Sequence, residues 1–280
     1  MQKEVKLIML NSVNAKESLP MKQILIKTNR LTKNFGAITA VDRLDLEVFG
    51  GEIYGFLGPN GSGKTTTIRM LTGLLEPTSG EAFICGYDIN REPARAKALI
   101  AYVPDQPRLY GKLTAREFLA LMADLYRMPP DYAREQAEQL LAMFELTDRA
   151  GELLEGFSHG MRQKVVLAAA LLHRPRVLLM DEPTVGLDPR SARLLKNVLQ
   201  ELARQGAAVF VSTHILEIAE RMCHRVGILK EGRLIAQGSP EELRQQVGHA
   251  GESLEDIFLE LTGGAEDAEL IRSLGEEEQH

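Results

Sequence analysis

The glycine-rich stretch at residues 58–66 constrains this chain more than any other feature, because it fits one local fold. It reads Gly-Pro-Asn-Gly-Ser-Gly-Lys-Thr-Thr and matches the pattern G-x-x-x-x-G-K-[ST]. Residues 52–57 before it are mostly apolar without helical spacing, and residues 66–71 after it can form a helix. A strand, a glycine-rich loop and a helix in this order predict a phosphate-binding loop, in which backbone N–H groups face the anion.

The side chains of this loop predict which ligand it takes. Lys64 is expected to reach the β- and γ-phosphates of a nucleotide, and the hydroxyl of Thr65 is expected to bind Mg²⁺. A glycine-rich turn with an exposed lysine is the alternative, and the flanking strand and helix argue against it. The remaining candidate nucleotide-binding residues of the loop are Gly58, Pro59, Asn60, Gly61, Ser62, Gly63 and Thr66.

The composition excludes several classes of protein. The chain has 280 residues and a formal net charge of −6, so nothing in its overall charge suggests binding to nucleic acid. Cys85 and Cys223 have no C-x-x-C spacing, which argues against a zinc site and favours two small core residues. The longest apolar run, 165–172, is shorter than the roughly 20 residues that cross a membrane. We therefore expect a soluble protein, or one that reaches a membrane only through partners.

The first half of the chain predicts strands followed by an inserted helical region. Residues 1–20 form an extension without a clear pattern, and Met21 is an alternative start. Apolar alternation between residues 24 and 48 predicts antiparallel strands, and 81–85 and 100–103 predict two more. Thr114 and Glu117 form a capping box before a helix that the prolines at 129–130 stop, and residues 131–145 predict a second helix. Residues 108–165 are thus expected to form a helical subdomain.

The second half predicts alternating helices and strands. Ser158 begins a helix, the apolar run 177–180 predicts a doubly buried parallel strand, and Asp188 caps the next helix. Strands are expected at 207–212, 226–229 and 233–236, and helices from 215, from 239 and over 253–261. This alternation predicts an α/β fold with a mainly parallel sheet, whose ligand lies at the carboxyl ends of the strands. The nucleotide-binding domain is expected over 21–240, and a helical extension with an acidic tail over 241–280.

Three polar residues follow predicted strands. Asp181 can hold Mg²⁺ together with Thr65, and Glu182 is placed to act as general base on a water aimed at the γ-phosphate. His214 follows another apolar strand and is predicted to bond the γ-phosphate. A polar strand exit and an ordinary structural histidine are the alternatives. Glu182, His214 and Lys64 form the candidate catalytic set, and Asp181 and Thr65 are candidate metal ligands.

A further segment narrows the family. Residues 157–164 read Phe-Ser-His-Gly-Met-Arg-Gln-Lys and lie just before the strand that ends in Asp181. Together with 58–66, 177–182, 186–188 and 212–214, in this order, they make the chain resemble the ATP-binding cassette (ABC) ATPases that drive transporters. It looks most like the single-cassette subunits of bacterial exporters, and the resemblance covers residues 24–262.

The resemblance implies an ABC-type fold with an N-terminal antiparallel β subdomain, and a dimer of cassettes that uses ATP and Mg²⁺. Ser158 and Gly160 would contact the ATP held by a second subunit, and with His159 and Asp188 they would form the dimer interface. Asp188 alternatively serves only as a helix cap. Phe35 would stack on adenine, or alternatively pack in the core.

Two positions depart from the pattern of the family. The family has a Ser-Gly-Gly signature, which residues 158–160 match as Ser-His-Gly. His159 thus replaces the first signature glycine, and its Cβ restricts how closely the backbone can approach a ligand. In the loop that usually reads Tyr-x-Pro-Gln, Asp105 takes the place of the glutamine and Gln106 comes one residue later. Either residue could contact Mg²⁺ or its water, so both are candidate metal ligands.

The resulting hypothesis is an ATPase subunit that powers a separate transmembrane permease at the cytoplasmic face of the membrane. The resemblance places the permease contact near residues 105–110 and the helical insertion, and residues 253–258 favour export by analogy. A soluble cassette acting on ribosomes, a chromosome-handling ATPase and a non-hydrolysing module are alternatives. They fit less well, because there is one nucleotide loop, no long heptad run between 64 and 158, and both Lys64 and Glu182 are present.

Overall fold

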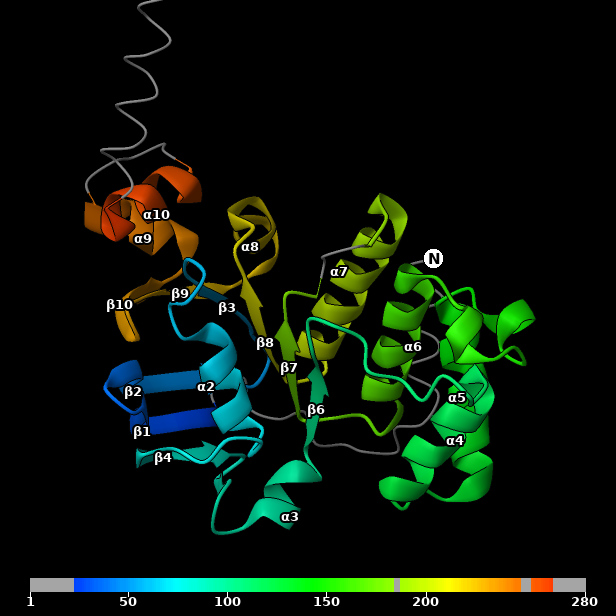
Figure 1. Cartoon of the computed structure of the whole chain (residues 1–280). Helices are drawn as coiled ribbons and strands as arrows, with labels where there is room; N and C mark the ends of the chain where they lie inside the picture. Colours follow the sequence, from blue (N-terminus) through cyan, green and yellow to red (C-terminus); the bar gives the residue numbers. More distant parts are fainter. Residues whose placement is uncertain (1–22, 184–186, 248–252, 264–280) are drawn as a thin grey trace, which may run out of the picture.

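Strands from both halves of the chain form two sheets in the computed structural model, which describes residues 23–183, 187–247 and 253–263. A four-stranded antiparallel sheet has the order β2-β1-β4-β5, and a six-stranded sheet has the order β10-β9-β3-β8-β7-β6. In Figure 1 the antiparallel strands lie on one side of the six-stranded sheet and helices α4, α5 and α6 on the other. The strands are β1 (Ile24–Phe35), β2 (Ile38–Phe49), β3 (Ile53–Leu57), β4 (Ser79–Ile84), β5 (Tyr87–Asp88), β6 (Ile100–Val103), β7 (Val177–Asp181), β8 (Ala208–Thr213), β9 (Arg225–Lys230) and β10 (Arg233–Gly238).

The six-stranded sheet is parallel except at β10, which pairs antiparallel with β9 at its edge. Its central strands are buried on both faces, which explains their continuous apolar sequence. Along β3, Ile53 and Leu57 join one hydrophobic cluster and Tyr54 and Phe56 join the other. The ring of Phe210 on β8 stacks on Tyr54 with centroids 5.7 Å apart, so the two neighbouring strands are fixed by side chains as well as by the ladder.

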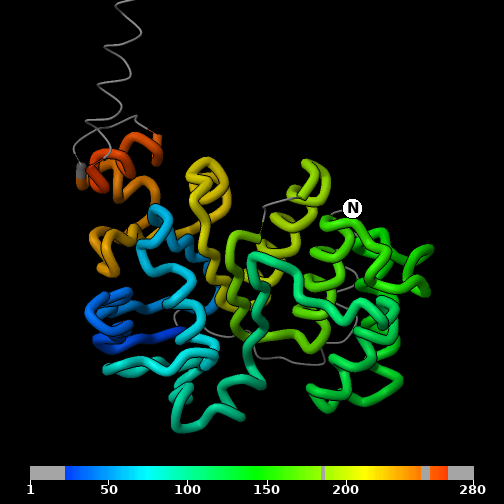
Figure 2. The backbone as a smooth tube through the Cα atoms, in the orientation of Figure 1, coloured from blue at the N-terminus to red at the C-terminus, as the bar shows by residue number. Residues whose placement is uncertain are grey.

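The helices cover the six-stranded sheet and build the insertion (Figures 1 and 2). Helix α2 buries Ile68, Met70 and Leu71 in the cluster shared by the two sheets. The insertion is confirmed as helical, and the predicted capping box of Thr114 and Glu117 is present. The helices are α2 (Lys64–Leu71), α3 (Pro93–Lys97), α4 (Ala115–Leu125), α5 (Pro130–Met143), α6 (His159–Leu172), α7 (Pro189–Arg204), α8 (Leu216–Met222), α9 (Pro240–Val247) and α10 (Leu254–Thr262), with single 3₁₀ turns at Thr147–Arg149 and Leu154–Gly156.

Helix α5 ends earlier than the apolar pattern predicted. Its last residue is Met143, whereas the sequence predicted a helix to residue 145. Glu145 has a φ of +59° and lies in the left-handed region, which a right-handed helix cannot continue through. Phe144 is therefore the C-cap of the helix, and the chain turns toward the first 3₁₀ turn.

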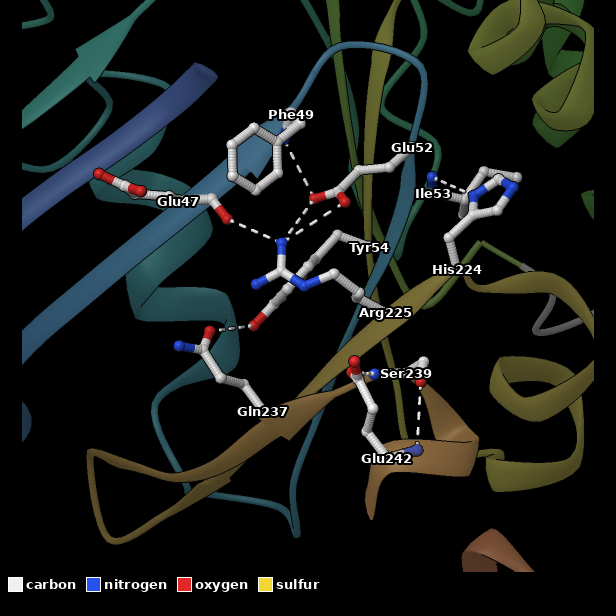
Figure 3. Close-up of polar contacts among 10 residues, drawn as sticks. All are labelled: Glu47, Phe49, Glu52, Ile53, Tyr54, His224, Arg225, Gln237, Ser239 and Glu242. Carbon is white, nitrogen blue, oxygen red and sulfur yellow. Dashed lines mark hydrogen bonds and ion pairs between the residues drawn. The ribbon is translucent and has the colours of Figure 1, made fainter. Parts of the chain in front are cut away.

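Arg225, the first residue of β9, joins the end of β2 to the start of β3, as Figure 3 shows. Its Nη1 donates to the carboxylate of Glu52 at 3.2 Å and to the Glu47 carbonyl at 3.3 Å. Its guanidinium lies 5.4 Å from the ring centroids of both Phe49 and Tyr54. Burial raises the pKa of Glu52, while the Phe49 amide and Arg225 counteract that rise. The paired charge fixes the turn that leads into β3, the strand that carries the phosphate-binding loop.

Several predictions fall outside the described residues or change in detail. The proposed extension at 1–20 and the acidic end from residue 264 lie outside the described residues. Cys223 is buried as predicted, whereas Cys85 is only half-buried, and both are free thiols. Among the described residues, no helix is long and apolar enough to cross a membrane.

Candidate nucleotide-binding and hydrolysis site

The phosphate-binding loop connects β3 to α2, where the sequence placed it. Gly63 caps α2 with a φ of +107°, and a Cβ on it would lie 2.3 Å from the Ala40 carbonyl oxygen. A Cβ on Gly58 would lie 2.4 Å from the Oγ of Ser62. Both positions therefore require glycine, Gly63 for its conformation as well as for space. This tight path leaves the N-terminus of α2 directly at the loop, which is the geometry that binds phosphate.

Lys64 lies folded over the loop that precedes it. Its Nζ donates to the carbonyls of Gly58 at 2.7 Å and Pro59 at 3.1 Å, and the side chain is buried. Burial lowers the pKa of Lys64, and the carboxylates of Glu182 and Asp181 act in the opposite direction. The ammonium therefore lies within electrostatic reach of both acids.

Asp181 ends β7 and is paired in register with Ser212 on β8. The Ser212 hydroxyl donates to Asp181 Oδ1 at 2.5 Å. The other oxygen, Oδ2, is buried and has no hydrogen-bond partner in the part of the chain that the structure describes. A buried carboxylate oxygen without a partner is costly, so this atom is available to a cation or to water.

Glu182 and His214 form a direct pair at the ends of the same two strands. His214 Nδ1 lies 2.9 Å from Glu182 Oε1, and the second carboxylate oxygen is buried without a partner among the described residues. Glu182 has a φ of +50°, and its N–H donates to the Ser212 carbonyl at 3.1 Å. Such a conformation costs about 1–3 kcal/mol in a non-glycine residue and is typical of functional sites. The His214 side chain is 55% exposed, so it faces the open side of the site.

The strand order explains why these four residues meet. β3, β8 and β7 are neighbours in the sheet. Asp181 is the last residue of β7, His214 follows β8, and Lys64 starts α2 after the loop that leaves β3. The predicted convergence at strand ends is therefore present. Ser212 is a site residue to which the sequence assigned no role, because its contact with Asp181 depends on the pairing of β7 with β8.

The signature residues lie on the helical insertion, apart from this set. Ser158 caps α6 by accepting a hydrogen bond from the Met161 N–H at 3.3 Å. Ser158 and His159 are exposed, and Gly160 is half-buried. Within the described residues, no hydrogen bond or ion pair joins these three to the loop or to the acids. In one copy of the chain the start of α6 is therefore exposed and separate from the loop and the acids.

Asp188 caps α7 and is exposed. Its Oδ1 accepts from the Ser191 N–H at 2.9 Å and its Oδ2 from the Ser191 hydroxyl at 2.6 Å. These hydrogen bonds lower the pKa of Asp188. The predicted cap is thus confirmed, and the interface role stays a prediction; residues 184–186 before it lie outside the described residues.

Phe35 is not a core residue. It ends β1, is 49% exposed, and has the Lys33 ammonium 5.3 Å from its ring centroid. The packing alternative is wrong, because the ring is open to solvent. Asp105 and Gln106 are both exposed in the loop after β6, so exposure does not distinguish which of them would contact Mg²⁺.

The residues present fit a Mg²⁺ ion that is bound together with a nucleotide. The Thr65 hydroxyl and the unpartnered Asp181 oxygen are hard oxygen donors. The described residues contain no group of three or more His, Cys, Asp or Glu that could hold a metal ion. This donor set suits a cation that also takes phosphate and water as ligands.

Comparison with known proteins agrees with this geometry. The family model described as ABC transporter matches residues 41–185. The linearmycin resistance ATP-binding protein LnrL of Bacillus subtilis is 37% identical over 253 residues, which cover 89% of this chain and 79% of that protein. The daunorubicin/doxorubicin resistance ATP-binding protein DrrA of Streptomyces peucetius is 39% identical over 223 residues, covering 80% of this chain and 68% of that protein.

Solved structures show the same fold. An ATP-binding subunit of an ABC transporter superposes with a TM-score of 0.81 at 36% identity, covering 85% of this chain and 99% of that one. A dimeric ATP-binding cassette in a post-hydrolysis state with ADP and Pi superposes with a TM-score of 0.71 at 30% identity, covering 77% of this chain and 98% of that one. The predicted α/β fold of the cassette type is confirmed.

Proposed function

Because this chain belongs to the ABC transporter family, as an ATP-binding and ATP-hydrolysing subunit, we propose that its site works in the following way. The observation that carries the proposal is the convergence of Lys64, Asp181, Glu182 and His214 at the ends of neighbouring strands. Residues 58–66 wrap the phosphates of ATP. Lys64 then exchanges its two carbonyl partners for phosphate oxygens, and Phe35 stacks on the adenine.

Glu182 is the general base of the hydrolysis. It accepts a proton from a water whose oxygen bonds to the γ-phosphorus, while the bond from that phosphorus to the bridging oxygen breaks and ADP leaves. His214 holds the Glu182 carboxylate at 2.9 Å in this structure and can turn its exposed ring to a γ-phosphate oxygen. Thr65 and Asp181 would hold Mg²⁺, and Asp105 or Gln106 would contact its water; the ion would supply positive charge to the phosphates.

A second copy or a second cassette completes the site. Ser158, His159 and Gly160 are accessible at the start of α6, and a helix N-terminus stabilises negative charge. We propose that they contact the γ-phosphate of ATP held by the partner, with Asp188 in the same interface. Two ATP molecules would then hold the dimer closed until hydrolysis releases it.

The partner in the membrane is proposed to be a separate permease, at the cytoplasmic face. A groove of about 400 Å³ lies between the loop after β6 and the insertion, and Tyr110 at its edge is 66% exposed. The names of the relatives, which include resistance and Nod factor export proteins, support export as the direction. They give no support to the ribosomal alternative. The residues that line the groove are Ala101, Tyr102, Pro104, Arg108, Leu109, Tyr110, Phe118, Met122, Leu125, Tyr126, Val166, Ala169 and Ala170.

The test of the site is ATP-driven dimerisation of a variant without the base. Glu182→Gln should bind ATP with wild-type affinity, lose about 10²–10⁴-fold in kcat, and elute as a dimer with ATP but not with ADP. Adding Ser158→Arg should keep ATP binding and abolish that dimer. Wild-type turnover by Glu182→Gln would exclude Glu182 as the base, and unchanged dimerisation with Ser158→Arg would exclude the signature contact.

The permease is tested by isolating the tagged chain from detergent-solubilised native membranes. We expect a polytopic membrane protein in near-equal amount. Recovery only in the soluble fraction, alone or with ribosomes, would contradict the transport proposal and leave the ATPase chemistry intact.

A further inference from the structure

Two side chains of the helical insertion converge on one carbonyl of the six-stranded sheet. Tyr126 is the residue after α4, His173 is the residue after α6, and Ile100 is the first residue of β6. The Tyr126 hydroxyl donates to the Ile100 oxygen at 3.3 Å, and His173 Nε2 lies 3.1 Å from the same atom. The two rings stack with their centroids 3.6 Å apart and an interplanar angle of 9°. The C-terminal ends of α4 and α6 are thus joined to the sheet at one shared acceptor.

The hydrogen bond defines the state of the histidine. A carbonyl oxygen only accepts, so Nε2 carries the hydrogen and Nδ1 is the bare nitrogen. Nδ1 is buried and has no partner among the described residues, which agrees with a neutral ring. Among the described residues, the Ile100 carbonyl is thus the hydrogen-bond partner of the His173 ring, and the stacked Tyr126 ring fixes its plane.

The stacked pair borders open space on one side. A cavity of about 740 Å³ opens next to both rings and is lined also by Lys97, Arg127 and Tyr132. On this side no side chain of the described residues packs against the pair. Helix α6 is held to the sheet mainly by its buried residues 165–172, and the two hydrogen bonds add a directional contact at its C-terminal end.

The helix that His173 terminates carries the signature serine at its other end. Helix α6 has 14 residues, with Ser158 before its first residue and His173 after its last. At 1.5 Å per residue it is roughly 21 Å long, so a tilt of about 5° at the anchored end moves Ser158 by roughly 2 Å. A displacement of about 1 Å is enough to cost on the order of 10²-fold in a reaction that depends on positioning.

We propose that Tyr126 and His173 are positioning residues, which set the angle of α6 to the sheet through the Ile100 carbonyl and so aim Ser158 at the ATP held by the second subunit. This inference rests on the proposed contact of Ser158 with that ATP. Neither residue touches the nucleotide, so the effect belongs to closure and turnover and not to nucleotide binding by one copy.

The experiment compares His173→Leu with His173→Gln and Tyr126→Phe in the purified full chain. Leu removes the donor, Gln offers an amide N–H at a similar reach, and Phe keeps the stacked ring without its hydroxyl. We expect kcat to fall about 10–100-fold in His173→Leu, less in Tyr126→Phe, and within about threefold of wild type in His173→Gln. Binding of a fluorescent ATP analogue to the monomer should stay within about twofold in all three.

The second readout is ATP-driven dimerisation in the Glu182→Gln background. His173→Leu should raise the protein concentration needed for the dimer at least about tenfold, and His173→Gln should restore it. Wild-type kcat in both His173→Leu and Tyr126→Phe would overturn the inference, as would a defect in His173→Gln equal to that of the leucine variant. If Glu182→Gln itself fails to dimerise, the proposed function is contradicted, and the kcat comparison then decides the positioning role separately.

Discussion

Gly63 shows most sharply how one residue constrains the site. Its φ of +107° is unfavourable for any side chain, and a Cβ would lie 2.3 Å from a backbone oxygen that cannot move aside easily. We predict that Gly63→Ala loses ATP binding and lowers the Tm. The control is Gly86→Ala, whose φ is +86° but whose Cβ would meet nothing within 4 Å. It should show a small loss of Tm with normal ATP binding. Equal Tm and equal ATP affinity in the two variants would contradict the clash.

His173 makes a prediction about pH at the same scale. Burial lowers its pKa from the ordinary 6.5 to about 4. The unfolded chain therefore binds a proton that the folded chain does not between these values, so stability falls as pH drops from 6.5 toward 4. The loss is at most about 3 kcal/mol in the free energy of unfolding. The hydrogen bond to the Ile100 carbonyl acts in the opposite direction and raises the pKa, but burial is the larger effect. Tyr126, Tyr132, Lys97 and Arg127 line the same cavity.

The measurement is urea unfolding of wild type and His173→Gln at pH 4.5, 5.5 and 7.5. The difference in unfolding free energy between the two proteins should shift in favour of the variant as the pH falls, because glutamine does not titrate. A difference that is the same at all three pH values would show that His173 does not titrate in this range.

At the scale of elements, helices α9 and α10 pack against α8, the helix that follows His214. Leu254 and Ile257 of α10 are fully buried and join the large cluster that also contains Ala219 and Met222 of α8. Arg244 of α9 forms an ion pair with Glu220 of α8. Helix α8 starts two residues after His214, so the packing of α8 helps to fix the position of His214.

We predict that Ile257→Ala lowers the free energy of unfolding by about 2–5 kcal/mol, the usual loss for a buried large-to-small change. It should also speed hydrogen exchange in α8. Ile235→Ala is the control, because Ile235 on β10 is 40% exposed, and it should change stability by less than about 0.5 kcal/mol. Equal stability of the two variants would mean that α10 does not belong to the cooperative core.

At the scale of the molecule, the two hydrophobic clusters lie on opposite faces of the six-stranded sheet. One joins the antiparallel sheet and α2 to one face of the six-stranded sheet, and the other joins the insertion, α7 and α10 to the opposite face. The proposed catalytic groups lie at or near strand ends, whereas Ser158, His159 and Gly160 lie at the start of α6 on the insertion. Movement of the insertion against the sheet would therefore change the signature without disturbing Lys64 or Glu182.

The permease contact is a prediction for the whole assembly. Tyr110→Glu places a charge on an exposed ring at the edge of the groove, so it should reduce recovery of the permease at least about tenfold while basal ATP hydrolysis stays within about twofold. Leu74→Glu is the matched control, since Leu74 is 63% exposed and does not line the groove. Equal permease recovery with both variants would contradict docking in this groove.

Local signals in the sequence determined much of this protein. The glycine-rich loop, the capping box at Thr114, the cap at Asp188 and the doubly buried strand before Asp181 each depend on neighbours within a few residues, and all are present. The resemblance to the cassette family supplied the functional class and the partner roles. Asp181, Glu182 and His214 could be predicted as neighbours from the sequence, because the carboxyl ends of parallel strands lie at the same edge of a sheet.

Tertiary structure alone decided what depends on partners distant in the chain. The hydrogen bond from Ser212 to Asp181 follows from the register of β7 on β8, and the exposure of Phe35 follows from what lies beside the end of β1. The anchoring of Tyr126 and His173 on Ile100 has the same origin, whereas the early end of α5 at Met143 follows the local left-handed conformation of Glu145. Apolar periodicity reports that a face is buried, but not which residue covers it, and that pairing is set only when the whole chain packs.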